Sequence, residues 1–241
     1  MQPTSFYQMI EKILYYERDL FLALNGSDSP LLDRFMWLYS GKAVWVPVAL
    51  LIFFILVYKK GWKESLFILV GITLVVTLCD QFASSICKPL FERYRPTHHP
   101  EFMNLVDTVF GYRGGRYGFI SSHAANAFGF ATFMAMLFKN KLFTWTIFIW
   151  ALVTAYSRIY LGVHFISDVV PGMIAGTLFG YTVYLLYKWS RTQVLARKAI
   201  LSPPNALYSK GEKQLVVGGV FVTVIFLLMF NVSLSVLLLN A

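Results

Sequence analysis

The chain has 241 residues, of which 57% are hydrophobic and 14% are charged, and its formal net charge is +9. A soluble domain is usually about 45–50% apolar and about 25% charged, so this composition excludes an ordinary soluble protein and predicts an integral membrane protein. The basic residues lie in connections between long apolar runs, without a basic face that carries stacking aromatics. We therefore do not expect nucleic acid as a partner, and a lipid bilayer is the expected surrounding.

Residues 1–42 precede the first long apolar run and predict an interfacial amphipathic segment. Within it, residues 5–24 are typical of an amphipathic helix, with Ile13 and Leu14 on an apolar face and too many charges to cross a bilayer. A turn cluster at 25–30 separates this helix from a second short interfacial piece. No basic region followed by an apolar core is present, so we expect no cleavable signal peptide.

Apolar runs account for most of the remaining chain. A bilayer core is crossed by about 20 apolar residues, and the runs predict about six transmembrane helices. They cover residues 43–58, 64–87, 119–138, 142–160, 168–188 and 214–239. The predicted fold class is an all-α integral membrane protein, in which a bundle of about six transmembrane helices follows an N-terminal amphipathic interfacial helix. We expect three parts: residues 1–42, a central bundle at 43–188, and residues 189–241, which form a basic cytoplasmic connection and an additional C-terminal transmembrane helix.

The distribution of Lys and Arg predicts which side of the membrane each connection faces. Connections 59–63, 139–141 and 188–213 are basic, and the opposite side carries almost as many basic residues. The difference in the number of basic residues between the two sides grows when Lys88 and two arginines with an expected function are set aside. The side with more Lys and Arg is then predicted to be cytoplasmic. The other ends of the helices would face the periplasm or cell exterior, in a multi-pass protein of a bacterial-type cytoplasmic (inner) membrane.

Three polar clusters fall at this outer side because the helices alternate in direction. The first is "KPLFERYRP", Lys88 to Pro96; the second is "ISSH", Ile120 to His123; the third is "SRIYLGVHFISD", Ser157 to Asp168. A charged side chain inside a bilayer costs at least a few kcal/mol, so polar residues kept at a span end suggest a task.

The cations and serines of these clusters are suited to binding a phosphate. Arg95 and Arg158 present planar forks that match pairs of phosphate oxygens, and Lys88 adds a third positive charge. Ser121 and Ser122 stand at a predicted helix N-terminus, where free N–H groups and the helix dipole favour an anion.

The remaining polar residues supply acid–base and nucleophilic groups. His164 and Asp168 are four residues apart and share a face if the segment is helical. The carboxylate could accept one imidazole N–H and leave the other nitrogen free as a nucleophile. His123 could then protonate a leaving oxygen. This inventory favours phosphoryl transfer through a covalent phosphohistidine.

Three motifs of this chain resemble, in order and spacing, the three-part signature of the type 2 phosphatidic acid phosphatase family. They are Lys88-x6-Arg95-Pro96, a Ser-x-His, and Ser157-Arg158-x5-His164-x3-Asp168. That family includes membrane lipid phosphatases and relatives of the vanadium haloperoxidases, and the resemblance covers about residues 30–188. It implies that His164 is the nucleophile, Asp168 its orienting carboxylate and His123 the acid. The implied phosphate ligands are Lys88, Arg95, Ser121, Ser122 and Arg158.

The middle motif departs from the family pattern. The family usually has Pro-Ser-Gly-His, whereas this chain has Ile120-Ser121-Ser122-His123. Ser122 adds a Cβ where the backbone would approach the phosphate, although its N–H is retained. The family needs no metal or other cofactor, and the sequence offers no metal cluster beyond the same histidines and aspartate.

The predicted function is a metal-independent lipid phosphatase, with its site at the outer membrane–water boundary and a lipid phosphate as substrate. Among envelope lipids we favour lipid A phosphate or undecaprenyl diphosphate. Phosphatidic acid or phosphatidylglycerophosphate phosphatase activity and lipid phosphotransfer are alternatives. An organic-anion transporter is the non-enzyme alternative, but it predicts polar residues at mid-span and inverted repeats.

Three further observations concern residues near the clusters. Arg113 and Arg116, in a glycine-containing loop, are candidates for holding an anionic headgroup. Asp80 lies inside a span, where an acid is either functional or a buried structural partner. His98 and His99 follow Pro96 and match no motif, so we expect them in a solvated loop.

Overall fold

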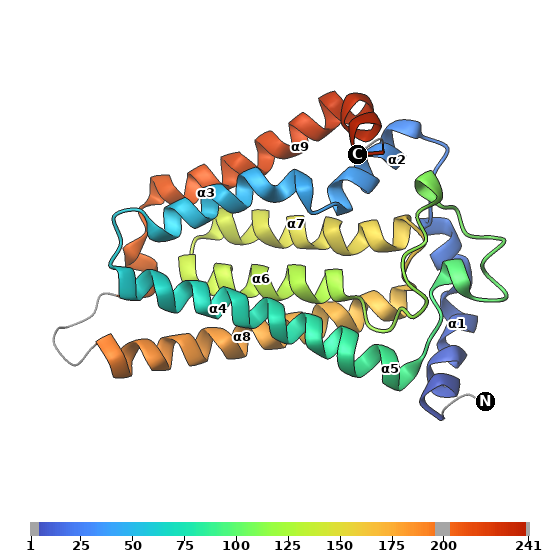
Figure 1. Ribbon diagram of the computed structural model, residues 1–241, viewed down its shortest axis with the longest axis horizontal. Coiled ribbons are helices and arrows are strands. Elements are labelled where there is room, and N and C mark those ends of the chain that lie inside the picture. Colours follow the sequence, from blue (N-terminus) through green and yellow to red (C-terminus); the bar gives the residue numbers. More distant parts are fainter. Residues whose placement is uncertain (1–4, 196–202, 240–241) are drawn as a thin grey trace.

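The computed structural model describes residues 5–195 and 203–239, and Figure 1 shows them as a bundle of helices. The helices are α1 Ser5–Leu24, α2 Pro30–Ser40, α3 Val46–Val57, α4 Trp62–Gln81, α5 Lys88–Phe91, α6 Ser122–Phe138, α7 Lys141–Tyr160, α8 Ile166–Leu195 and α9 Lys210–Leu239. The described residues contain no strand, only an isolated bridge between Tyr94 and Tyr117. The all-α prediction is confirmed, whereas Arg197 and Lys198 of the expected basic connection lie outside the described residues.

Four helical stretches are long and apolar enough to cross a membrane. They are Trp62–Phe91, Lys141–Tyr160, Ile166–Val194 and Lys210–Leu239. A fifth crossing results if the bent pair Pro30–Ser40 and Ala43–Val57 counts as one span. The remaining expected span, residues 119–138, corresponds to α6, which has 17 residues and is shorter than these. The chain is therefore a multi-pass membrane protein with four to five candidate spans.

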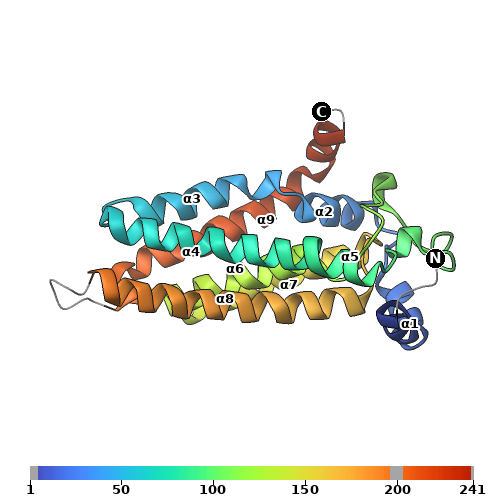
Figure 2. The ribbon, with the colours of Figure 1, turned by 60° about the horizontal axis from the view of Figure 1, so that its bottom comes forward.

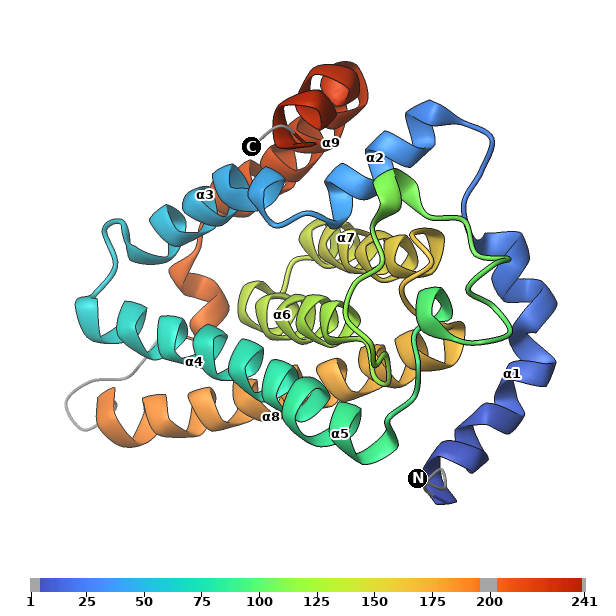
Figure 3. The same cartoon turned by 45° about the vertical axis from the view of Figure 1, so that its right-hand side comes forward.

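Helix α6 occupies the centre of the bundle, with α4, α7 and α8 packed around it (Figure 3). Its contact with α8 is unusually close because small residues face each other. A Cβ on Gly176 would lie 2.1 Å from the carbonyl oxygen of Ala125, and one on Gly180 would lie 2.3 Å from that of Gly129. Without a hydrophobic driving force in lipid, small residues let helix backbones pack closely. This contact fixes α6 against α8, and both helices carry predicted site residues in their first turn.

The long helix that begins at Trp62 changes its winding before it ends. After α4, residues Phe82–Cys87 form π-helical turns, and α5 continues directly from them at Lys88. Short π-helical segments inside α-helices occur frequently at functional sites. Here the segment leads into the first predicted phosphate ligand.

The irregular segments 92–121 and 161–165 gather at one end of the bundle, and α1 lies across this same end in Figures 1 and 3. Helix α2 meets the α3 segment at this end with a bend of 70°. Helix α9 is kinked at Phe230, and its last turns diverge from the bundle axis in Figure 2. All three predicted polar clusters therefore meet at one end of the fold.

Candidate active site

Residues from all three clusters line one cavity, which we call the central cavity. Its volume of ≈ 590 Å³ lies within the range of roughly 300–1,000 Å³ that is typical of ligand sites. Of the predicted site residues, it is lined by Lys88, Arg95, Ser122, His123 and His164. Lys42 and Asp80 also line it, so the intramembrane acid noted in the sequence belongs to the wall of the cavity.

His164 lies in the short loop between α7 and α8 and is buried. Its Nε2 is 3.1 Å from Nη1 of Arg95, and its Nδ1 is 3.5 Å from Oδ2 of Asp168. A guanidinium can only donate, so Nε2 must accept, and we infer that the imidazole proton is on Nδ1, facing the carboxylate. Burial, together with the positive charges of Arg95, Arg158 and Lys88, holds the pKa of His164 well below its usual value. The imidazole is therefore neutral, as a nucleophile must be.

The three predicted phosphate-binding cations have polar partners but no counter-ion. Lys88 Nζ donates to Ser122 Oγ at 2.9 Å, and Arg95 Nη1 donates to the carbonyl of Val163 at 3.2 Å. In the part of the chain that the structure describes, no ion pair links Lys88, Arg95 or Arg158 to a carboxylate. Burial and the nearby Arg158 lower the pKa of Arg95. Such an unneutralised cluster favours an anion.

Arg158 and His123 also line a second space of about 370 Å³, which we call the side hollow. Arg158 is buried, and its two terminal nitrogens donate to Ser40 Oγ and, at 3.1 Å, to the hydroxyl of Tyr112. Burial raises the pKa of Tyr112, but the charge of Arg158, its hydrogen bond to the hydroxyl, and the charges of Arg95 and Lys42 together outweigh burial, and the net direction is downward. The hollow adjoins the central cavity because both are lined by His123 and by residues 40–42.

The two serines of the middle motif have different positions. Ser121 is fully buried; its hydroxyl caps α6 by accepting from the N–H of Ala124 at 3.4 Å, and its own N–H donates to the carbonyl of Asp168 at 3.0 Å. Its side chain is not among those that line the central cavity. Ser122, which replaces the family's glycine, instead lines the cavity, and its hydroxyl accepts a hydrogen bond from the ammonium group of Lys88.

Arg93 is a residue of this site that the sequence patterns did not single out. Its side chain is completely buried, and Nη1 lies 2.6 Å from Oδ1 of Asp168. Nη2 lies 3.1 Å from Oε1 of Glu17, and Nε lies 3.6 Å from Oε1 of Glu11. Burial lowers the pKa of Arg93, but these carboxylates outweigh it and raise the pKa overall. Arg93 thus occupies one oxygen of Asp168, while the other accepts from the N–H of Phe165 at 3.0 Å and lies 3.5 Å from Nδ1 of His164.

Two of the carboxylates around Arg93, those of Glu11 and Glu17, come from α1, far away in the sequence. Glu17 also accepts from the N–H of Ser167 at 2.8 Å, in the first turn of α8, and from the Ser167 hydroxyl. Ser167 in turn accepts from Arg93 at 2.7 Å. The only signal in the sequence was a second arginine two residues before Arg95, since its partners lie on a helix outside the motif set.

The loop residues noted in the sequence lie outside the central cavity. Arg116 is exposed, donates to the Tyr94 hydroxyl at 2.8 Å and stacks over its ring, while the carbonyl of Arg113 accepts from Thr97. The solvated-loop prediction is wrong for His99, which is buried with Nε2 at 3.0 Å from Oε2 of Glu11. His99 therefore joins the structural network of α1.

No group of three or more His, Cys, Asp or Glu side chains within residues 5–195 and 203–239 is placed to hold a metal ion. The charged side chains that line the central cavity are three cations, Lys42, Lys88 and Arg95, and one acid, Asp80, and this excess of positive charge suits an anionic group.

Fold and site together define a multi-pass membrane protein with a buried anion site and a carboxylate-held histidine at one end of its helical bundle. Comparison with known families gives a match to the PAP2 superfamily over residues 65–192. The chain belongs to this superfamily.

Individual relatives cover more of the chain than the family match does. A lipid A 4'-phosphatase of Porphyromonas gingivalis is 48% identical over 83% of this chain and 84% of its own length. A lipid A 4'-phosphatase of Bacteroides thetaiotaomicron is 41% identical over 74% of this chain and 80% of its own length. Among solved structures, LpxE of Aquifex aeolicus is similar, with 28% identity and a TM-score of 0.51, covering 68% of this chain and 92% of that one.

Proposed function

We propose that this membrane lipid phosphatase removes the 4'-phosphate of lipid A. One observation carries the proposal: a neutral His164, held by Asp168, turns its free nitrogen toward a buried cluster of cations that lack counter-ions. A phosphate group would supply the missing negative charge. The names of the two relatives with 48% and 41% identity support the choice of lipid and of position.

The proposed reaction begins when the phosphate enters the central cavity and receives hydrogen bonds from Lys88, Arg95 and Arg158. In accepting them, it replaces Nε2 of His164 as the acceptor for Arg95. Nε2 then attacks phosphorus in line with the departing sugar oxygen, so that a P–N bond forms while the P–O bond breaks. His123 donates a proton to the leaving oxygen.

The second half of the reaction regenerates the enzyme. A water molecule, deprotonated by His123, attacks the phosphohistidine, and inorganic phosphate leaves as the P–N bond breaks. Asp168 stabilises the positive charge on the imidazole through Nδ1 in both halves. We assign to Ser121 the capping of α6, whose first N–H groups would face the phosphate, and to Ser122 the positioning of Lys88.

We further propose six membrane crossings, counting α6 and the segment Ala43–Val57, with α1 and α2 lying in the interface. In this arrangement residues 1–42 form the interfacial segment, 43–188 the catalytic bundle, and 189–241 the cytoplasmic connection and last helix. The site would face the periplasm across the inner membrane, which the Lys and Arg distribution supports. Exposed Arg113 and Arg116 are then placed for the second phosphate of a doubly charged headgroup.

Phosphate release from the detergent-solubilised protein tests the function. The panel consists of lipid A, lipid A lacking the 4'-phosphate, undecaprenyl diphosphate, phosphatidic acid and phosphatidylglycerophosphate. We expect lipid A to be the best substrate and its 4'-dephosphorylated form to release little phosphate. Higher kcat/KM for undecaprenyl diphosphate or phosphatidic acid would overturn the assignment to lipid A.

Two histidine variants test the mechanism on the same panel. His164→Ala should abolish phosphate release, since it removes the nucleophile. His98→Ala is the matched control, because His98 lies in the loop after Arg95 and does not line the central cavity. Unchanged turnover in His164→Ala would rule out the phosphohistidine.

A further inference from the structure

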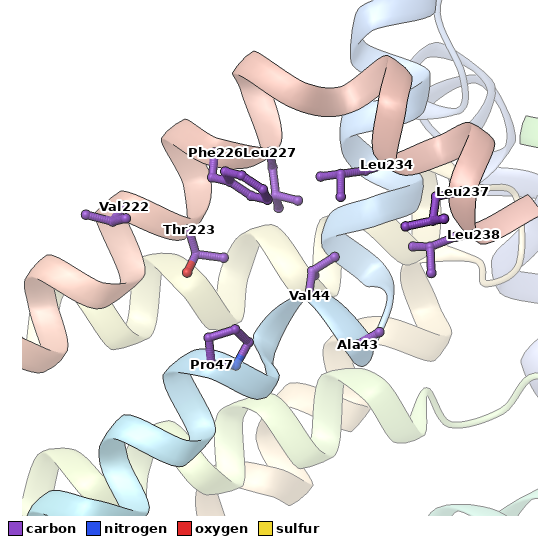
Figure 4. Close-up of a pocket in the computed structure, with 10 residues that line it drawn as sticks. All are labelled: Ala43, Val44, Pro47, Val222, Thr223, Phe226, Leu227, Leu234, Leu237 and Leu238. Carbon is purple, nitrogen blue, oxygen red and sulfur yellow. The ribbon is translucent and has the colours of Figure 1, made fainter. Parts of the chain in front are cut away.

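A groove lies between α9 and the segment that leads into α3, and its surface is almost wholly apolar. Figure 4 shows its side chains projecting into the space between the two elements. The groove has a volume of about 400 Å³ and is lined by Ala43, Val44, Pro47, Val222, Thr223, Phe226, Leu227, Leu234, Leu237 and Leu238. Its lining comes from both sides of the kink at Phe230, so the bend of α9 shapes it.

This groove is continuous with the phosphate site. Ala43, Val44 and Leu238 line both the groove and the side hollow. Residues 40–42 and His123 then line both the side hollow and the central cavity. The bend between α2 and α3 therefore borders three connected spaces, which lead from the buried cations to an apolar groove.

The chemistry changes in one direction along these spaces. At one end are Lys88, Arg95 and His164; at the junction, exposed Lys42 lines both the central cavity and the side hollow; beyond it the lining is hydrocarbon. A ligand that fits this order has a phosphate at one end, a polar body next to it and a long apolar chain. An acylated phospholipid or glycolipid has that order of groups.

We propose that the groove binds one acyl chain of the phosphorylated lipid whose phosphate occupies the central cavity, an inference that rests on the proposed function. Both walls of the groove lie outside residues 65–192, the part that matches the superfamily. The groove thus lies outside the part of the chain that matches the superfamily, and under this proposal it selects substrates by their chain.

Filling the groove with indole rings tests this inference. Thr223→Trp and Leu237→Trp place a large side chain in the groove at positions that line neither the side hollow nor the central cavity. Val232→Trp and Val236→Trp are matched controls on the same helix, because both positions are exposed and line none of the three spaces. Val236 directly precedes Leu237, so the tryptophans of these two variants would differ mainly in the direction in which they point from α9.

Each variant is assayed with lipid A and with the acyl-free glucosamine disaccharide bisphosphate, which has the same phosphates without chains. We expect the groove variants to raise KM for lipid A by about tenfold, as steric exclusion of part of a substrate commonly does. Their kcat/KM on the acyl-free compound should match wild type, and the controls should match it on both substrates. Equal losses on the two substrates, or no loss on lipid A, would overturn the proposal.

Photolabelling separates a failure of the groove from a failure of the proposed function. A phosphatidic acid with a diazirine in its acyl chain should label residues 222–238, and excess phosphatidic acid should prevent labelling where phosphatidylcholine does not. Labelling in this pattern without phosphate release from lipid A would keep the groove and overturn the proposed lipid A 4'-phosphatase activity. Labelling prevented equally by phosphatidylcholine would mean that bulk lipid fills the groove, and the proposal would be wrong.

Discussion

Arg93 and Arg95 are two residues apart and both buried, yet their surroundings are opposite. Arg93 is enclosed by carboxylates of Asp168, Glu17 and Glu11, which raise its pKa. Arg95 contacts His164 and backbone carbonyls, and burial beside Arg158 lowers its pKa.

The difference between these surroundings points to two uses of a buried arginine, one in stability and one in ligand binding. A buried ion pair is strongly destabilised when one partner is removed, because the other charge stays unpaired. A buried cation without a counter-ion lowers stability in the empty site and is available to a ligand anion. We therefore expect Arg93 to have a structural task, to hold Asp168, and Arg95 to bind the phosphate of the proposed reaction.

The largest effect should come from Arg95→Met. We expect kcat to fall by about 10²–10³-fold, as when a preorganised electrostatic donor is removed from an active site. The melting temperature should stay the same or rise, since a positive charge near Arg158 has been removed. Phosphate release and thermal unfolding in detergent check both parts. A variant that is active, or one that is inactive because it unfolds, would break the comparison.

Arg93→Met should show the reverse pattern. Asp168 and Glu17 would stay buried without their shared cation, so we expect a loss of about 3–5 kcal/mol in the free energy of unfolding. Denaturation in detergent, run beside Arg95→Met, measures it. Equal stability of the two variants would show that the carboxylates around Arg93 do not make it more important for stability than Arg95.

A smaller effect is expected for Glu17→Gln, which keeps the size of the side chain and removes its charge. Losing one charge-assisted hydrogen bond to Arg93 should lower stability by about 1.5–3 kcal/mol. Glu92→Gln is the control, because Glu92 is exposed and directly precedes Arg93 in the sequence. If the two variants unfold alike, α1 does not support the site through Glu17.

The smallest effect concerns pH. Protonating His164 adds a charge beside Arg95 and Arg158, so its pKa is below 6.5 and the acid limb of kcat/KM should also lie below pH 6.5. Removing one of these cations makes protonation easier. The residual activity of Arg95→Met should therefore decline at a higher pH than that of wild type. An acid limb that stays at the wild-type pH, or moves to lower pH, would contradict the assignment of Arg95 as a cation that lowers the pKa of His164.

Local composition was enough to predict the helical class and the position of the apolar runs. The spacing of Lys88, Arg95, His164 and Asp168 was enough to predict that they meet, since consecutive spans alternate in direction. Lys88, Arg95 and His164 line the central cavity, Arg95 lies 3.1 Å from His164, and Asp168 lies 3.5 Å from His164. Their catalytic roles remain predictions for the variants above.

The parts that sequence patterns did not predict depend on partners far apart in the chain. Glu17 is one charge among several on an amphipathic helix, and only the packing of α1 across the bundle end brings it to Arg93. The apolar groove likewise joins residues 43–47 to α9, two segments that share no motif. By contrast, the spacing of Gly172, Gly176 and Gly180 was visible and could have indicated the close contact of α6 and α8.

The π-helical turns at Phe82–Cys87 make the site sensitive to chain length in a way that substitutions do not test. Each residue of an α-helix turns the chain by about 100°, since 3.6 residues complete a turn. A π-helical stretch accommodates one residue more than an α-helix does over nearly the same rotation. An insertion or deletion in the regular winding of α4 before it would therefore rotate Lys88 by about 100° and carry its ammonium nitrogen away from the hydroxyl of Ser122, now at 2.9 Å. The angular register of the phosphate lysine thus depends on the number of residues before it, and a single insertion or deletion would change the site while every catalytic side chain remained in the sequence.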